Sequence, residues 1–268
     1  MTGTEHTATT AWLKVLGQLL SMPKTINPTV ELLNHTMSFN MAHPIVLASS
    51  RQLSYRYMAA ESYWTITGSN RLDQSESVKQ TLIKWSADTI YLKGAYGPGF
   101  VTQMPYILEI LRNQPSSRQA VISIWTPNPR DPNDLPCTLT LQFLIRDKLL
   151  HCIVNMRSSD VYLGLPNDMF VFTMMAACVL IESQLADSDG VKLGTCFVNA
   201  GSRHLYETNR TQAHEVFVSP KIREEEVVFE PHTYTFKHFI EWLRSATFAP
   251  TRAKAQEILL GVSHDKTY

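Results

Sequence analysis

The sequence predicts a single α+β domain with a substantial sheet and a few long helices. Residues 10–21 and 52–65 repeat apolar side chains every three to four positions, which is the period of a helix. Residues 138–145 alternate apolar and polar side chains, and residues 149–156 follow after a polar Arg-Asp-Lys turn, which is typical of a hairpin. The order of these elements along the chain fits one α+β domain covering residues 1–268.

The first half of the chain is predicted to be mostly helical. Each helix is placed by its apolar period and by a stop signal after it, such as Gly68-Ser69-Asn70 or Pro115. The elements expected here are a helix at 10–21, short strands within 29–48, a helix at 52–65, a turn-rich stretch at 72–100 and a helix at 106–113.

The second half is predicted to hold most of the sheet. The expected elements are a strand at 120–125, a proline-rich loop at 126–136, the hairpin, a helix at 168–184, a strand at 193–198, a helix at 206–216, a strand at 225–229 and a helix at 236–245. The most apolar window, 169–181, is too short to span a bilayer, so we expect a buried helix there.

Composition narrows the classes of protein that fit. The chain has 24 Lys and Arg residues and 24 Asp and Glu residues, so the formal net charge is zero and the pI is about 7.1. This balance argues against a basic arm for nucleic acid, and we expect no nucleic-acid partner. The N-terminus lacks a basic region followed by an apolar run, so we expect no signal peptide and no membrane partner.

The four cysteines do not have the spacing of a metal site. No C-x-x-C pair is present, which predicts that no zinc is bound. Cys152, Cys178 and Cys196 lie in apolar stretches and are expected to be packed, reduced thiols of a cytoplasmic protein. Cys137 differs because it closes the proline-rich loop and opens a strand. A thiol there can be reached by substrate, and a positive neighbour would make it a nucleophile; a packed thiol is the alternative.

Three polar segments interrupt the apolar pattern. Arg157-Ser158-Ser159-Asp160 follows a buried-looking strand, and it is either a solvated strand end or an anion site. Asp168 opens the apolar helix, where an aspartate is an ordinary N-cap. Residues 201–206, Gly-Ser-Arg-His-Leu-Tyr, form a polar segment between a strand and a helix. None of these segments is specific alone.

Together and in this order the motifs resemble the thymidylate synthase family. PCTLTLQFLIRDKLLHCIVNMRSSDVYLGLPNDMF is similar to that family's Pro-Cys site, Gln-Phe strand, Arg-Ser-x-Asp motif and Gly-Leu-Pro helix start. AGSRHLYETN, AAESYWTITGSN and NQPSSRQAVISIW resemble further family segments. The resemblance spans about residues 24–218 and leaves the C-terminal part unassigned. It implies a large mixed sheet packed against long helices, with one sheet face used for homodimerisation.

The resemblance implies roles for the matching residues. Cys137 would add to C6 of a pyrimidine, Glu61 would order the water that moves protons, and Tyr96 would lie beside the reacting centre. The 5′-phosphate would be held by Arg157, Ser158, Lys24 and the partner subunit's Arg118, and Gln142 would lie beside the nucleotide. His204 and Tyr206 would bind the sugar. Asp160 and Gly164 would contact the pterin of the co-substrate 5,10-methylenetetrahydrofolate.

Asp168 stands where thymidylate synthases have asparagine, which predicts a change of base. An amide matches uracil, because it accepts from N3–H and donates to O4. A carboxyl group accepts from the N4 amino group of cytosine and, when protonated, donates to N3; a carboxylate facing uracil O4 repels it. Leaving such a buried pair unmatched costs about 1–3 kcal/mol. Asp168 therefore predicts a preference for cytosine.

The same replacement occurs in the hydroxymethylase branch of the family, which the chain resembles most closely. That branch implies transfer of a one-carbon unit to C5 of deoxycytidylate, followed by capture by water to give 5-hydroxymethyl-dCMP. Three alternatives stay open: the same reaction on ribo-CMP, reductive methylation as in thymidylate synthase, and a nucleotide-binding module without activity.

Two departures weaken the expected phosphate site. The family's arginine in the N-terminal phosphate loop is matched by Lys24, which keeps the charge but lacks the bidentate geometry of a guanidinium. The family's Arg-Arg pair is Arg118-Gln119 here, so one cross-subunit charge is missing.

Overall fold

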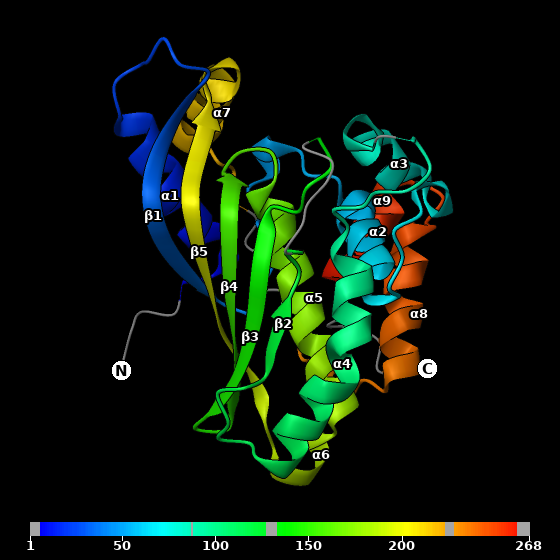
Figure 1. Ribbon diagram of the computed structural model, residues 1–268. Helices are drawn as coiled ribbons and strands as arrows, with labels where there is room; N and C mark the ends of the chain where they lie inside the picture. The colour runs from blue at the N-terminus through cyan, green and yellow to red at the C-terminus, as the bar shows by residue number, and fades with distance from the viewer. Residues whose placement is uncertain (1–5, 87, 127–132, 223–227, 262–268) are drawn as a thin grey trace.

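A computed structural model describes residues 6–86, 88–126, 133–222 and 228–261 (Figure 1). A five-stranded mixed sheet has the order β1-β5-β4-β3-β2. β4 and β5 are parallel, and the other neighbours are antiparallel. The strands are β1 (Thr29–Asn40), β2 (Val121–Ser123), β3 (Thr138–Arg146), β4 (Leu149–Asp160) and β5 (Lys192–Tyr206).

Helices pack on one face of this sheet and continue beyond its β2 edge (Figure 1). The α-helices are α1 (Ala8–Ser21), α2 (Tyr55–Ile66), α3 (Glu76–Leu82), α4 (Tyr96–Asn113), α5 (Leu165–Ser183), α6 (Leu185–Asp189), α7 (Arg210–Val218), α8 (Phe236–Thr247) and α9 (Arg252–Leu260). Short 3-10 turns occur at Ser49–Arg51, Leu72–Gln74, Ile83–Trp85, Glu207–Asn209 and Pro231–Thr233.

α5 is the central helix of the core. It is apolar all round, and it packs on β4 and β5 as well as on α2 and α4. Its length and composition would let it cross a membrane, yet 78% of its apolar window is buried inside the protein, as in the core helix of a globular domain. The burial predicted for 169–181 is confirmed, and the helix predicted at 168–184 runs from Leu165 to Ser183, so it begins three residues earlier.

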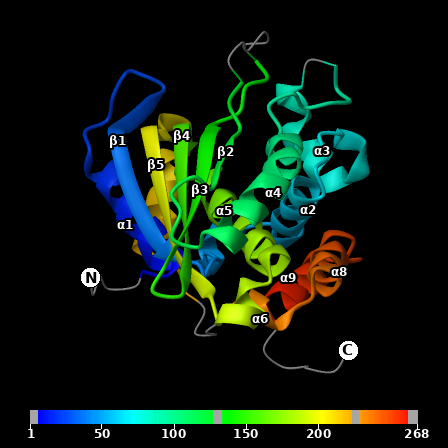
Figure 2. The same cartoon turned by 60° about the horizontal axis from the view of Figure 1, so that its bottom comes forward.

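The helices beside the sheet form a second layer (Figure 2). α2 lies between α5 on one side and α8 and α9 on the other. α3 also packs against α2, where Trp64 of α2 and Val78 of α3 belong to one apolar cluster. A small separate apolar cluster joins α2 to the following turns; it comprises Ala60, Trp64, Leu72, Val78 and Leu92. α2 is therefore held on several sides, which fixes the direction of side chains on its α5-facing surface.

Three adjacent strands change faces at the same level. In β5 the buried side chains are even-numbered from Cys196 to Ala200 and include the odd-numbered Arg203 and Leu205 beyond it. β4 changes in the same way between Met156 and Ser159. The pairing of β5 with both neighbours skips Gly201. On β1 the skipped residue is Asn34, which has φ +49°. Such an irregularity turns the following side chains to the other face, so polar residues beyond it point inward.

The opposite sheet face carries a hydrogen-bonded polar ladder. Thr36 Oγ1 donates to Asn199 Oδ1 at 2.8 Å, Asn199 Nδ2 donates to Asn155 Oδ1 at 3.1 Å, and Asn155 Nδ2 donates to Thr140 Oγ1 at 2.9 Å. The ladder crosses β1, β5, β4 and β3. Phe197 lies on the same face and is 36% exposed. We call this surface the outer sheet face.

The predicted α+β class is confirmed, and the hairpin turns at Asp147 and Lys148, both at positive φ as a two-residue turn requires. Several boundaries were wrong. Residues 29–40 form one strand rather than short strands, because the irregularity at Asn34 breaks the alternation without ending the pairing. α4 begins ten residues before the predicted 106, since Gly and Pro in its first turns resemble a loop.

The predictions near the C-terminal end were the least accurate. β5 continues to Tyr206, so the helix predicted at 206–216 begins only at Arg210. The strand predicted at 225–229 falls mostly outside the described residues, and Val228 and Phe229 are not in a strand. α3 and α9 were not predicted at all.

Candidate active site

Four side chains from three helices lie close together on the side of the sheet that the helices cover. Tyr57 and Glu61 come from α2, Tyr96 is the first residue of α4, and Asp168 lies in the first turn of α5. Each is coupled electrostatically to others of the group. We call these four residues the acidic cluster. Cys137, which directly precedes β3, interacts with both Tyr96 and Asp168, so the predicted nucleophile lies beside the cluster.

Glu61 is the most strongly perturbed acid of the cluster. Burial and the nearby Asp168 carboxylate raise the pKa of Glu61 to about 8, although a hydrogen bond with the Tyr57 side chain opposes this. Tyr57 lies one turn before Glu61, so helix geometry alone brings the two side chains together. At neutral pH Glu61 therefore carries a proton that it can give or share.

Asp168 is more acidic than Glu61. The pKa of Asp168 is raised to about 6: burial raises it most, the Arg203 guanidinium opposes this shift, and Asp160 adds a smaller increase. Asp168 is not the N-cap that the sequence suggested. α5 begins at Leu165 with Pro166 in its first turn, Gly164 is the cap residue, and the Asp168 backbone N–H donates to Gly164 O at 3.0 Å. The Asp168 carboxylate faces the site instead.

Cys137 is half-buried and held by Arg157. Arg157 Nη2 lies 3.9 Å from Cys137 Sγ, and Arg157 Nε donates to Pro136 O at 2.9 Å. The Arg157 backbone N–H also donates to Cys137 O at 2.9 Å. Burial nevertheless raises the pKa of the Cys137 thiol, while Arg157 opposes the shift. The expected positive neighbour is therefore present, but in the free protein it does not outweigh burial.

Tyr96 is fixed by the segment before α4. Asp134, which is buried, accepts from Gly94 N at 2.7 Å and from Lys93 N at 2.8 Å. Gly94 packs so closely on Leu135 that a Cβ would lie 2.9 Å from its carbonyl carbon. This contact joins the start of α4 to the segment that carries Cys137, so Tyr96 and Cys137 are positioned together.

The end of β4 and the start of α5 form a tight polar turn. Asp160 Oδ1 accepts from Tyr162 N at 2.8 Å and from Leu163 N at 2.9 Å. Arg51 donates to Tyr162 O and stacks on the Tyr162 ring at 4.2 Å. Asn167 Oδ1 is buried there without a partner. Asp160 and Gly164, the residues expected at the pterin, therefore lie in a turn with an unsatisfied acceptor that a donor on a bound molecule fits.

His204 and Tyr206 lie near the end of β5. Their rings meet edge to face with centroids 5.2 Å apart, and His204 is paired with Asp160 across the parallel strands. Ser158 pairs with Ser202 in the same way. Lys24 is exposed, and the next residue, Thr25, donates its N–H to Glu207 at 3.2 Å. Lys24, Tyr206 and the end of β4 thus gather at one end of the sheet.

Arg118 and Gln142 lie elsewhere. Gln142 is on the outer sheet face, and its Nε2 donates to Arg118 O at 2.8 Å. The Arg118 side chain is exposed. Within one chain, the structure therefore keeps these two residues away from the acidic cluster.

One member of the acidic cluster, Tyr57, and one residue near it, Arg203, were not identified from the sequence. Tyr57 could have been found from its i−4 spacing to Glu61. Arg203 is fully buried beside Asp168, whereas the sequence placed it in a loop. Its burial follows from the change of face at Gly201, which no alternation pattern reveals.

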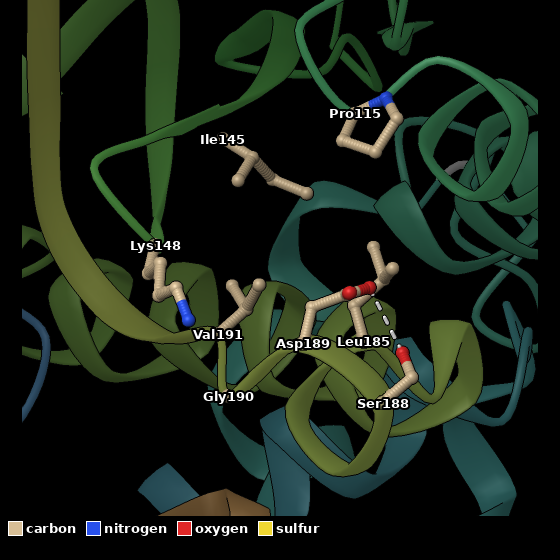
Figure 3. Close-up of a pocket in the computed structure, with 8 residues that line it drawn as sticks. All are labelled: Pro115, Ile145, Lys148, Leu185, Ser188, Asp189, Gly190 and Val191. Atoms are coloured by element: carbon tan, nitrogen blue, oxygen red, sulfur yellow. Dashed lines mark hydrogen bonds between the residues drawn. The ribbon is translucent and has the colours of Figure 1, made fainter.

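Other concave and polar places do not share this chemistry. A hollow of about 490 Å³ lies at the β3–β4 turn, and Figure 3 shows Lys148, Asp189 and Ser188 around it; Ser188 Oγ donates to Asp189 Oδ2 at 2.9 Å. Among the described residues, no group of three or more His, Cys, Asp or Glu side chains is arranged to hold a metal ion.

A thiol beside a mixed sheet, with two perturbed carboxyl groups and an arginine near the sulfur, has the kinds of group that covalent chemistry on a small molecule uses. Residues 17–239 match the family model described as thymidylate synthase. The chain belongs to the thymidylate synthase family. The reaction of that family is the transfer of a one-carbon unit from methylenetetrahydrofolate to C5 of a nucleotide.

Proposed function

We propose that the protein transfers a one-carbon unit to C5 of a cytidine 5′-monophosphate nucleotide and that water captures it, giving 5-hydroxymethyl-dCMP. The observation that carries this proposal is Asp168, a buried acid with a pKa of about 6 in the acidic cluster, where the family's synthases have asparagine. Above pH 6 it is largely a carboxylate, which accepts a hydrogen bond from the cytosine amino group and repels uracil O4.

Cys137 is proposed as the nucleophile. Its thiolate adds to C6 of the base, which makes C5 a nucleophilic carbon that takes up the one-carbon unit supplied by methylenetetrahydrofolate. Arg157, 3.9 Å from the sulfur, favours the thiolate as it forms. Expulsion of Cys137 from C6 restores the ring at the end of the cycle.

Glu61 and Asp168 are proposed to divide the remaining work. Asp168 stabilises the charge that develops at N3 and N4 while the ring is saturated. Glu61, whose pKa of about 8 keeps it protonated at neutral pH, exchanges protons with an ordered water at C5 and at the exocyclic carbon. Tyr57 orients the Glu61 carboxyl group through their hydrogen bond, and Tyr96 lies against Cys137 and the acids.

The nucleotide is proposed to lie along the ends of β4 and β5. Arg157, Ser158 and Lys24 hold the phosphate, and His204 and Tyr206 hold the sugar. Asp160 and Gly164 contact the pterin. Arg118 and Gln142 serve the site of a second copy, in a homodimer that packs through the outer sheet face. The position of Gln142 on the outer sheet face and its hydrogen bond to Arg118 O favour this arrangement.

The experiment compares wild type with Asp168→Asn on dCMP and dUMP. An amide donates to uracil O4, so the ratio of kcat/KM for dCMP over dUMP is expected to fall by about tenfold or more, which corresponds to 1–3 kcal/mol. Asp187→Asn, an exposed aspartate on α6, is the matched control and leaves the ratio unchanged. An Asp168→Asn enzyme that keeps the wild-type preference for cytosine contradicts the proposed basis of specificity.

A further inference from the structure

Arg203 is an arginine buried in the core with incomplete hydrogen bonding. Its Nη1 donates to Ser159 Oγ at 3.1 Å and its Nη2 donates to Val198 O at 2.9 Å. Its side chain is fully buried, and its Nε has no partner. Both anchors are neutral, so the two hydrogen bonds orient the guanidinium but do not balance its charge.

The charged groups around Arg203 identify its counter-charge. Asp168 is the group that raises the pKa of Arg203 against burial, which lowers it to about 10, so the guanidinium stays charged at neutral pH. On the β1 side, Arg203 lowers the pKa of His35, as does Lys14 of α1. Lys14 is a cation and His35 becomes one when protonated, so neither supplies negative charge. Asp168 is therefore the group that balances the charge of Arg203.

The other titratable groups that face Asp168 have the opposite effect or none. Asp160 on β4 raises its pKa. Glu61 and Tyr57 on α2, Tyr96 on α4 and Cys137 are uncharged when protonated, and they offer no positive charge. Arg203 is therefore the cation that offsets the burial of the Asp168 carboxylate.

We propose that Arg203 is a positioning residue for base recognition, which holds Asp168 as a carboxylate so that position 168 accepts a hydrogen bond from the substrate base. The link to cytosine rests on the proposed function, whereas the link between the two side chains does not. The change of face at Gly201 makes it possible, because it turns Arg203 inward, where Arg203 donates to Ser159 Oγ. Ser159 directly precedes Asp160, and a Cβ on Gly164 would lie 3.6 Å from Asp160 O and 3.5 Å from Asp168 Oδ2, so Arg203 and Asp168 flank the same turn.

The expected effect has a definite sign. Asp168 has a pKa of about 6 with Arg203 present. Loss of a nearby opposite charge raises the pKa of a carboxyl group by about 1–3 units. Without the Arg203 charge, Asp168 is protonated in part of the molecules at neutral pH. In those molecules its hydroxyl group donates a hydrogen bond.

The test is the titration of the Asp168 carboxyl group by ¹³C NMR in the nucleotide-free protein, with Asp168→Asn used to assign the signal. Arg203→Met keeps the length of the side chain and removes its charge, and its midpoint is expected to rise by about one pH unit or more. Arg203→Lys restores a charge and is expected to return the midpoint toward wild type. A purely structural role of Arg203 would not produce this pattern.

An unchanged midpoint in folded Arg203→Met contradicts the proposal. If Arg203→Met does not fold, the double variant Arg203→Met/Asp168→Asn tests the proposal instead. A double variant that folds supports a charge balance between the two residues. A double variant that is as unstable as Arg203→Met contradicts it. The titration is independent of activity. A shifted midpoint in a protein that makes no cytosine product therefore refutes the proposed function and leaves the role of Arg203 intact.

Discussion

Glu61 and Asp168 are two carboxylic acids in one site whose surroundings give them different pKa values. Glu61, which has Asp168 but no arginine among its influences, has a pKa of about 8. Asp168, which has Arg203 nearby, has a pKa of about 6. At neutral pH the first is mostly protonated and the second mostly ionised, so one site holds a proton donor and an anionic acceptor side by side.

The raised pKa of Glu61 makes stability depend on pH. The folded protein holds the Glu61 proton up to about pH 8, whereas the unfolded chain releases it near 4.5. Between these values the folded state binds more protons, so the free energy of unfolding falls as pH rises, by up to about 1.4 kcal/mol per pH unit. Glu61→Gln lacks this slope and is expected to gain stability relative to wild type from pH 5 to pH 8.

Urea unfolding at both pH values measures this difference. Glu109→Gln, at an exposed position of α4, is the control and should follow the wild-type slope. Parallel behaviour of Glu61→Gln and wild type would show that Glu61 ionises at its ordinary pKa.

At the scale of elements, the site depends on where strands and helices begin and end. α5 starts at Leu165 rather than at Asp168, which leaves the Asp168 carboxylate available to the site. α4 starts at Tyr96, close to the segment that carries Cys137, and Asp134 joins the two. Short-range contacts at element ends thus align groups that are distant in sequence.

Asp134→Ala tests this alignment. It removes the acceptor of two backbone N–H groups, so we expect a loss of about 1–3 kcal/mol in the free energy of unfolding. Turnover should fall more than nucleotide binding, because Tyr96 and Cys137 lose their common support. Asp134→Asn, which keeps one acceptor oxygen, should recover part of the loss. Full activity and stability in Asp134→Ala would show that the contact is dispensable.

The sequence predicts the long regular elements well. The hairpin, α1, α2 and the buried helix follow from apolar periods, because one face of each meets the core. It fails where backbone irregularity decides the outcome. The start of α4 is disguised by Gly and Pro, and the inward turn of Arg203 depends on the skipped pairing at Gly201. Cys137, Glu61, Tyr96 and Asp168 were found through motif order, since no local pattern relates them.

At the scale of the whole molecule, the outer sheet face is the proposed contact between two copies. It carries the ladder from Thr36 to Thr140 as well as the partly exposed Phe197, and Arg118 and Gln142 lie beside it. A symmetric dimer through this face brings each Arg118 toward the other chain's site.

Mixing two inactive variants tests shared sites. Cys137→Ser is expected to bind nucleotide but not to turn over, and Arg118→Ala to bind phosphate weakly. In a random equal mixture, half of the dimers hold one intact site, so about a quarter of wild-type activity should return. Each variant mixed with itself is the control. A mixture no more active than the separate variants would show that Arg118 does not act across subunits.

The most direct test of the central claim is mass spectrometry of the product formed from dCMP, CMP or dUMP with methylenetetrahydrofolate. We expect dCMP to yield a nucleotide heavier by one CH₂O unit, with Cys137→Ser giving none. The same product from CMP alone would place the reaction on the ribonucleotide. A product heavier by CH₂, turnover of dUMP alone, or no product from any of the three would contradict cytosine hydroxymethylation.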